Sequence, residues 1–356
     1  MRFRAQLKNI GTFQSKLTPS LPQLTAALSS LEKIAWVRLD NHVARFTAIP
    51  DTGSHVWATF NMDVIFDEVS ISSKEPDNAI NLELPLAPLQ RALKSALNSV
   101  SADMKLSKRA SDGVPVLAMT ISTLTNPTTA AANQPRGGAY GAGGAVDVDA
   151  DDDDLTGYPI ENLETSLRRE REKVITHEIP IRVLYPESVE TIMQPKTRDP
   201  DVNITFPPLL HLKALADRFT RLTAAGATSR SAAPKLELSA NMFGSLRLSV
   251  RTDGGSVSSE WAGLVTPELN PEQMSLPVEE HPTTRFREAG PERWASVRVD
   301  GKDLSRVLSV GRLEGRVIGS FIDDHALILY CYISHFDEAT VAEESVMTYY
   351  VQSYAQ

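Results

Sequence analysis

The stretch INLELPLAPLQRALKSAL, residues 80–97, joins a short strand to an amphipathic helix without an intervening loop. Residues Ile80–Leu84 alternate between apolar and polar side chains, which is typical of a strand with one buried face. Leucines then recur at helical spacing, so one side of the following helix is apolar, which predicts that it packs on a sheet. These leucines are Leu86, Leu89, Leu93 and Leu97.

Short strand patterns extend from this unit in both directions and are separated by turn residues. In the first part of the chain they are Arg2–Leu7, Ile34–Leu39, Val43–Ile49, Val56–Asn61, Met104–Ser107 and Val114–Thr123. In the second part they are Val174–Leu184, Val202–Phe206, Lys235–Ala240, Ser245–Arg251, Ser256–Trp261, Ala295–Val299, Arg316–Ile322, His325–Ile333 and Val346–Ser353.

Each half also carries two longer helical patterns. The first half adds Thr18–Leu31, which has Thr18 as a candidate N-cap and a proline at the first helical position. The second half has Pro208–Leu222 and Lys302–Val310, and a short helix is expected at Pro186–Met193. Many short antiparallel strands with two helices in each half predict an α+β fold built from two topologically similar domains.

An abrupt change in composition separates the two halves. From Asn126 to Gly157 the sequence is rich in small residues and contains the acidic run DVDADDDD. Such a composition offers too little apolar surface to offset the entropy of ordering, so we expect a disordered linker. The expected domains are residues 1–125 and 174–356, joined by a connector over residues 126–173.

The overall composition is that of an ordinary folded protein. A length of 356 residues allows two domains, and 42% hydrophobic with 23% charged residues excludes a wholly disordered chain. No apolar run reaches the roughly 18–20 residues of a membrane span, and the N-terminus lacks the apolar core of a signal peptide. The single cysteine, Cys331, excludes an internal disulfide and is expected to lie in the core. These features predict an intracellular protein without a membrane partner.

The motifs of catalysis and metal binding are missing from the sequence. His177-Glu178 begins like a zinc-protease motif, but Ile181 stands where the second histidine is needed. The acidic run lacks the glycine and the glutamate of a calcium-binding loop. We therefore expect no catalytic residue, no cofactor and no metal site.

Three helices carry basic residues opposite their apolar stripes, in a chain whose net charge is −9. Basic residues gathered on helices of an otherwise acidic protein favour contact with phosphates. An ordinary solvated helix face is the alternative explanation. The candidate phosphate-contacting residues are Arg91, Lys94, Lys213, Arg218, Arg221, Lys302 and Arg306.

Several collinear segments resemble one known family. They are Met1-Arg-Phe-Arg-Ala, Asn81-Leu-Glu-Leu, Leu89-Gln-Arg-Ala-Leu-Lys, Thr176-His-Glu-Ile-Pro-Ile-Arg-Val, Asp199-Pro-Asp-Val-Asn-Ile and Val297–Leu308. In order and spacing they are similar to the Hus-one family, a subunit of the heterotrimeric checkpoint clamp for DNA damage, the nine-one-one complex. The resemblance covers both halves and omits the linker.

The resemblance implies a fold like that of the replication clamp PCNA, with antiparallel sheets outside and helices lining a hole for duplex DNA. It further implies two paralogous partner subunits, an ATP-dependent clamp loader, and checkpoint and repair proteins as partners in the nucleus. The subunit would be non-catalytic and would contact double-stranded DNA without sequence specificity.

Clamp rings of this kind close by pairing edge strands of neighbouring subunits, and the resemblance implies that Val114–Ile121 and Ser256–Trp261 are these edges. Pro115 suits an edge because proline cannot donate to a ladder. The expected interface residues are Val114, Val116, Ala118, Thr120, Ser256, Val257, Ser258 and Glu260. Two alternatives remain open, a homotrimeric processivity clamp for a DNA polymerase and an enzyme whose site is dispersed over both halves.

Overall fold

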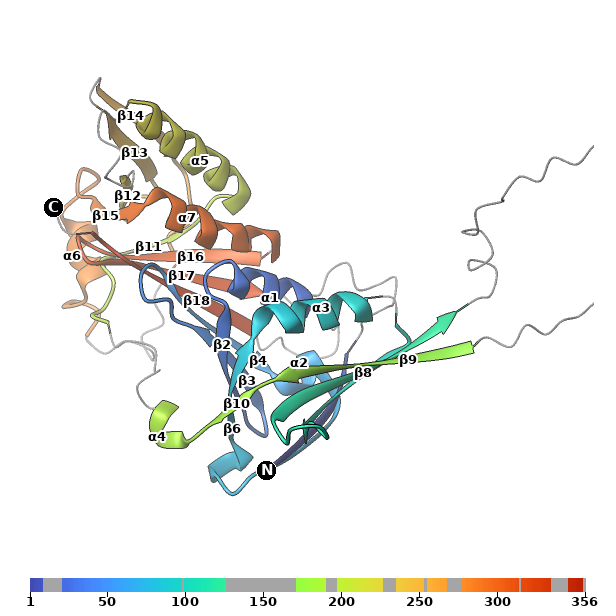
Figure 1. Cartoon of the computed structure of the whole chain (residues 1–356). Helices are drawn as coiled ribbons and strands as arrows, with labels where there is room; N and C mark the ends of the chain where they lie inside the picture. The colour runs from blue at the N-terminus through green and yellow to red at the C-terminus, as the bar shows by residue number, and fades with distance from the viewer. Residues whose placement is uncertain are drawn as a thin grey trace, which may run out of the picture.

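The computed structural model describes residues 1–8, 21–97, 99–125, 171–189, 197–226, 235–252, 255–267, 277–313, 315–333 and 345–354. Within these ranges the strands form three antiparallel sheets, and the long helices lie along one side of them (Figure 1). The linker expected between the halves lies outside the described residues over positions 126–170.

The three sheets differ in size. The first has five strands in the order β5 (Phe66–Ser72), β1 (Arg2–Leu7), β7 (Ser101–Lys108), β8 (Pro115–Thr125) and β9 (Arg171–Pro180). The second has nine, in the order β10 (Arg182–Leu184), β6 (Ile80–Pro85), β2 (Ile34–Leu39), β3 (Val43–Ala48), β4 (His55–Asn61), β18 (Ser345–Gln352), β17 (Ala326–Ile333), β16 (Gly315–Ile322) and β11 (Val202–Thr205). The third has four, in the order β14 (Gly255–Trp261), β13 (Leu246–Thr252), β12 (Lys235–Ala240) and β15 (Ala295–Asp300).

Four helices pack in two pairs, α1 (Leu21–Ser29) with α3 (Leu86–Ala96), and α5 (Leu209–Gly226) with α7 (Gly301–Leu308). Figure 1 shows them following one another along the sheets in the order α5, α7, α1 and α3. The shorter elements are α2 (Met62–Ile65), α4 (Pro186–Val189), α6 (Pro282–Glu288), η1 (Pro76–Asn78) and η4 (Ser309–Leu313).

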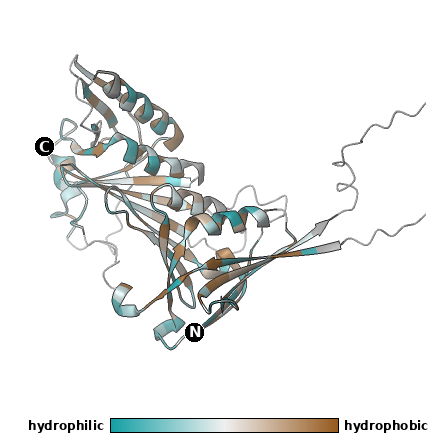
Figure 2. Cartoon of the chain, in the orientation of Figure 1, coloured by the Kyte–Doolittle hydropathy of each residue, from teal (hydrophilic) through white to brown (hydrophobic). Residues whose placement is uncertain are grey.

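The apolar stripes of the helices hold them on the sheets. Leu86, Leu89 and Leu93 of α3 are at most 2% exposed, and Leu28 of α1 is fully buried. Each such leucine contributes about 1.5–3 kcal/mol by leaving water. Figure 2 shows hydrophilic and hydrophobic residues alternating around these helices, as expected for elements with one buried side. Leu97, expected on the same stripe, follows the last residue of α3 and is exposed.

The order of elements repeats along the chain, so that a strand, a helix, several strands, a second helix and three closing strands occur twice. The two repeats meet inside the nine-stranded sheet, where β4 of the first pairs with β18 of the second. Val56 lies opposite Tyr349, and Thr59 lies opposite Val346. The prediction of an α+β fold with two similar halves is confirmed.

The strand that follows the linker belongs to the first repeat. Sequence analysis places Val174–Leu184 at the start of the second domain, and this placement is wrong. Strand β9 pairs with β8 from Val116 opposite Pro180 to Thr125 opposite Arg171, and β10 then pairs with β6. The chain thus completes the five-stranded sheet and the first repeat's part of the nine-stranded sheet before β11 begins the second repeat. The alternation of side chains identifies a strand but does not identify its partner.

We expect that deleting Ala130–Asp154 leaves the fold intact. Thr125 and Arg171 are ladder partners, so the segment between them closes a hairpin whose ends are already adjacent. Halving a loop changes the free energy of unfolding by about 0.6 kcal/mol, so Tm should change by about 2 °C or less. Calorimetry measures this, with Leu28→Ala as a positive control that should cost about 2–5 kcal/mol. A large fall in Tm on deletion would show that the segment is structural.

The remaining expectations about the core concern single residues. Cys331 on β17 is buried, as predicted, and burial raises the pKa of its thiol to about 12. The proposed N-cap Thr18 lies outside the described residues. No helix in the described part of the chain is long and apolar enough to cross a membrane.

Candidate functional site

The outer side of α3 carries two of the expected basic residues. Arg91 and Lys94 lie out of phase with the leucine stripe, and both are exposed. The helix contains no acidic residue that could neutralise them within its own turns. Two cations therefore face solvent from the side of α3 that points away from the core.

Helix α5 presents Arg218 and Arg221 in the same way, since both are exposed. Lys213 behaves differently, because its Nζ lies 2.9 Å from Oδ2 of Asp217 and 2.7 Å from Oγ of Ser305 on α7. Only 22% of its side chain is exposed. The structure gives Lys213 the role of a bridge between α5 and α7, so it is left out of the solvent-facing set.

Helix α7 adds Lys302 and Arg306, which are both exposed. Asp300 caps the N-terminus of the helix, because its side chain accepts hydrogen bonds from the backbone N–H groups of Lys302 and Asp303 at 2.9 and 3.0 Å. The side chain of Asp303 then accepts a hydrogen bond of 2.6 Å from Ser54, which lies before β4. This bond ties α7 to the first repeat.

The charge on the row of helices is more basic than the chain as a whole. The only acidic residues in the described parts of α1, α3, α5 and α7 are Asp217 and Asp303. Both are engaged internally, the first with Lys213 and the second with Ser54. A net charge of −9 is thus compatible with a locally positive face. The basic face consists of Arg91, Lys94, Arg218, Arg221, Lys302 and Arg306.

The bridge between α5 and α7 lowers the pKa of the Asp217 carboxyl group. Partial burial acts to raise the pKa of Asp217, but hydrogen bonds from Ser305 and Lys213 and the charges of Lys213 and Arg221 outweigh it, so the pKa is lowered from 3.8. A carboxyl group whose pKa is lower in the folded state stabilises that state above its ordinary pKa. The contribution is lost as pH falls through the lowered value.

We expect Asp217→Asn to lower the free energy of unfolding at pH 7 by no more than about 1 kcal/mol, because 38% of the Asp217 side chain is exposed and solvent screens its ion pair with Lys213. The difference from wild type should shrink below about pH 4 and disappear in stronger acid, where both chains lack the charge. Urea unfolding at several pH values measures it. Asp67→Asn on β5 is the matched control, since Asp67 is exposed. A difference that persisted unchanged in acid would contradict the assignment.

The strand edges of the molecule differ from those expected. Strand β8 is paired on both sides, with β7 and with β9, so it has no open edge. Val116 and Ala118 are buried in this sheet, and Thr120 lies between Asp103 on β7 and Thr176 on β9. Val114 precedes β8, and its carbonyl accepts a hydrogen bond from the backbone N–H of Arg109. The expectation that these residues lie on an open strand edge is therefore wrong. Among the described strands, β9 is the one that has no second neighbour at this end of the five-stranded sheet.

The other expected edge agrees with the structure. Strand β14 pairs with β13 and has no second neighbour among the described strands. Ser256, Val257, Ser258 and Glu260 all lie on β14 and are all exposed. Their part in an interface stays a prediction.

Sequence reasoning did not identify β9 as an edge strand, because its partner β8 is far away in the sequence. Two features of β9 become apparent only from its position in the sheet: Val174 is apolar and exposed, and Glu178 pairs with Arg109 at 3.2 Å. The repeat itself supplies the missing signal. Strand β18 closes the second repeat just as β9 closes the first, and β18 pairs with β4. Strand β14 holds the position of β4 in the second repeat, so β9 and β14 occupy the same places in their repeats as the internally paired strands β18 and β4.

Two repeated halves joined by one continuous sheet, with their helices in one row, give the chain a PCNA-like α+β fold. The structure is similar to Proliferating Cellular Nuclear Antigen from Entamoeba histolytica, with a TM-score of 0.58 at 11% identity over 99% of each chain. It is also similar to PCNA from Thermococcus kodakaraensis, with a TM-score of 0.55 at 13% identity over 99% of this chain and 100% of that one. At such identities the likeness concerns the fold.

The chain belongs to the Hus1-like protein family, whose model matches residues 1–355. It is 30% identical to the checkpoint protein hus1 of Schizosaccharomyces pombe over 99% of both chains. It is 21% identical to the checkpoint protein HUS1 of Homo sapiens over 76% of each chain. It is 22% identical to the hus1 homolog of Dictyostelium discoideum over 84% of this chain and 81% of that one. The resemblance drawn from the sequence is confirmed.

Proposed function

We propose that this chain is a non-catalytic subunit of a heterotrimeric ring clamp that encircles duplex DNA at sites of damage. One observation carries the proposal, namely the joint between β4 and β18 inside the chain. The same two positions of the repeat recur as the open edges β14 and β9. Pairing β14 of one subunit with the strand equivalent to β9 in the next would continue the internal joint from subunit to subunit.

Three such subunits would place six repeats around one hole. The row of helices would line the hole and the sheets would form the outer surface. The basic face then supports DNA binding, because exposed lysine and arginine side chains on helices contact phosphates without reading the base sequence. A ring that holds DNA by enclosing it needs only such weak contacts, which is compatible with an acidic chain.

The finer parts of the proposal follow from membership in the family. The subunit would assemble with two paralogous clamp subunits in the nucleus and would be loaded by an ATP-dependent clamp loader. It would then serve as a platform for checkpoint kinase activation and for repair enzymes. An enzyme whose site is dispersed over both halves stays an alternative. Among the described residues no group of three or more His, Cys, Asp or Glu side chains could hold a metal ion.

The mass of the assembled particle tests the proposal against a homotrimeric processivity clamp. We expect the purified chain alone to stay below the mass of a trimer in light scattering. Co-expression with two paralogous subunits of the clamp should give a single 1:1:1 particle that is retained on closed circular DNA and released by linearisation. A closed homotrimer of this chain alone would contradict the heterotrimer.

A further inference from the structure

The outer face of the five-stranded sheet, which points away from the core, carries a group of three cations. Arg2 and Arg4 on β1 alternate with the buried residues Phe3 and Ala5, so both side chains project from this outer face. Lys105 on β7 is the ladder partner of Arg4 and therefore lies on the same face. All three side chains are exposed.

The three charges are not neutralised within the described part of the chain. Neither arginine forms an ion pair with a described carboxylate, and Lys105 forms none either. Arg4 lies directly opposite Lys105, and like charges in this position destabilise a sheet. An anion bound next to Arg4 would remove this repulsion.

Strand β5 borders the three cations and presents an open edge. It pairs with β1 and has no second neighbour among the described strands. Its exposed residues Ser70 and Ser72 lie opposite Arg4 and Arg2. Because serine side chains are short, both arginines can extend across β5 toward its open edge. Such an edge is a template for an added strand.

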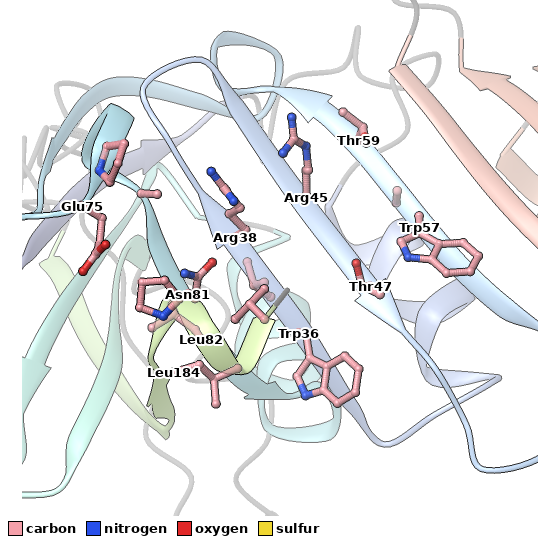
Figure 3. A pocket seen from close by; sticks show the side chains of 16 residues that line it. Trp36, Arg38, Arg45, Thr47, Trp57, Thr59, Glu75, Asn81, Leu82 and Leu184 are labelled. Carbon is pink, nitrogen blue, oxygen red and sulfur yellow. The ribbon is translucent and has the colours of Figure 1, made fainter. Parts of the chain in front are cut away.

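The outer face differs in its chemistry from the cavity on the nine-stranded sheet. Figure 3 shows Trp36 and Trp57 among the side chains that line that cavity. On the five-stranded sheet, the described residues that share a face with Arg4 include no aromatic side chain. A ligand of this face would therefore be held by charge and by hydrogen bonds.

We propose that the outer face binds a phosphorylated peptide segment of a partner protein, which adds to β5 as a further strand. The phosphoserine or phosphothreonine side chain of the peptide reaches the guanidinium groups of Arg2 and Arg4. The added strand lies two strand spacings from β1, about 9.6 Å, which a phosphoserine and an arginine side chain span together. A phosphate monoester carries about −1.5 to −2 charges and three acceptor oxygens, so it can pair with both arginines. Lys105 repels Arg4 from the opposite side and so favours its extension toward the ligand.

A phosphopeptide fits the outer face better than a nucleic acid does. Asp67 on β5 and Asp103 on β7 are the ladder partners of Gln6, the next residue of β1 on this face after Arg4. These carboxylates repel a polyanion but attract a lysine or arginine of a peptide. Ser70 and Asp67 are three residues apart, so this basic residue would lie about three residues from the phosphate. Strand addition also needs N–H groups that donate to the carbonyls of β5, and a nucleic-acid backbone has none.

The inference does not rest on the ring, because β5 is neither of the edges β9 and β14 that the proposed joints use. Selection of binders to the full chain from synthetic nonapeptides with a central phosphoserine tests it, and the same library with serine is the comparison. Binders should be enriched in lysine or arginine about three residues from the phosphoserine.

Synthetic copies of these binders should lose about ten-fold or more in affinity on the double variant Arg2→Gln, Arg4→Gln, measured by calorimetry, because charged hydrogen bonds are removed. The double variant Arg285→Gln, Arg287→Gln on α6 removes the same charge at exposed sites and should leave binding unchanged.

N-methylation of the peptide tests the added strand separately. Successive N–H groups of a strand point to opposite edges, so only every second nitrogen of the peptide donates to β5. We expect methylation of alternate nitrogens to abolish binding in one of the two possible phases and to preserve it in the other. Binding that survives in both phases would contradict strand addition.

Three further outcomes would overturn the proposal. The first is the absence of any binder that prefers the phosphorylated form. The second is binding of duplex DNA or oligothymidylate that is lost on Arg2→Gln, Arg4→Gln, which would make the outer face a site for nucleic acid. The third is peptide binding that appears only after deletion of residues 130–154, which would show that the chain's own acidic run occupies this face. Circular dichroism of each variant verifies that the loss of binding is not a loss of fold.

Discussion

A proline placed in β14 or in β9 separates the chain from one neighbour in the ring and leaves the chain itself folded. Strand β14 donates to β13 from one edge only, and β9 does the same toward β8. A proline whose nitrogen points outward removes a donor that the isolated chain does not use. In the ring it leaves a neighbour's carbonyl without a partner, which costs about 1–3 kcal/mol, or about 10- to 100-fold in affinity, in addition to the steric clash.

Pairs of variants make this test independent of the direction in which each N–H points. Successive N–H groups of a strand point to opposite edges, so one of Val257→Pro and Ser258→Pro places the change on the open edge of β14. Ile175→Pro and Thr176→Pro do the same on β9. We expect one variant of each pair to keep the wild-type Tm and to lose one paralogous subunit in co-purification. The two strands should lose different subunits.

An interior strand provides the control. Ser249 on β13 is flanked by β12 and β14, so Ser249→Pro should lower Tm whichever way its N–H points. Retention of both partner subunits by all four edge variants would contradict the assignment of β9 and β14 as the joints. Loss of the partner with Ala118→Pro at a normal Tm would restore β8 as an edge.

Neutralising the basic face changes how DNA binding depends on salt. The triple variant Arg91→Gln, Arg218→Gln, Arg306→Gln should flatten the slope of log K against log salt by about 2.7, since each lost phosphate contact contributes about 0.9. The measurement uses the assembled ring and duplex DNA over a series of salt concentrations. Assembly should be unaffected, because none of the three residues lies on an edge strand.

Lys213→Gln is the matched control for the triple variant. It removes one positive charge from the same helix row, but this charge is already engaged with Asp217 and Ser305. We expect its slope to equal that of wild type, while the unfolding free energy falls by up to about 1 kcal/mol. Equal slopes for wild type and the triple variant would mean that the helices carry ordinary solvated faces. A Lys213→Gln slope flattened by about 0.9 would place Lys213 among the phosphate contacts.

The sequence predicts those features that depend on local periodicity. Leu86, Leu89 and Leu93 mark a helix and its buried side because all three positions lie within two turns. Arg91 and Lys94 follow from the same periodicity, since residues out of phase with a buried stripe are exposed.

Features that depend on distant partners could not be predicted in this way. Whether Val116 faces an open edge depends on Pro180, which lies beyond the linker. Whether Lys213 is available depends on Ser305 in another helix. The group of cations on the five-stranded sheet requires β1 and β7 to be aligned in register, and a shift of one residue would send Lys105 into the core.

The continuous sheet through β4 and β18 determines where a closed ring would be mechanically weakest. Inside the chain the two repeats share a ladder, a common apolar core and the hydrogen bond between Ser54 and Asp303. A joint between chains would have the ladder of two edge strands, and each partner could dissociate. Opening the ring to admit DNA would therefore occur between subunits and would leave the continuous sheet inside each subunit intact. With three different chains the three joints would differ in strength, so that a loader could open the same one each time.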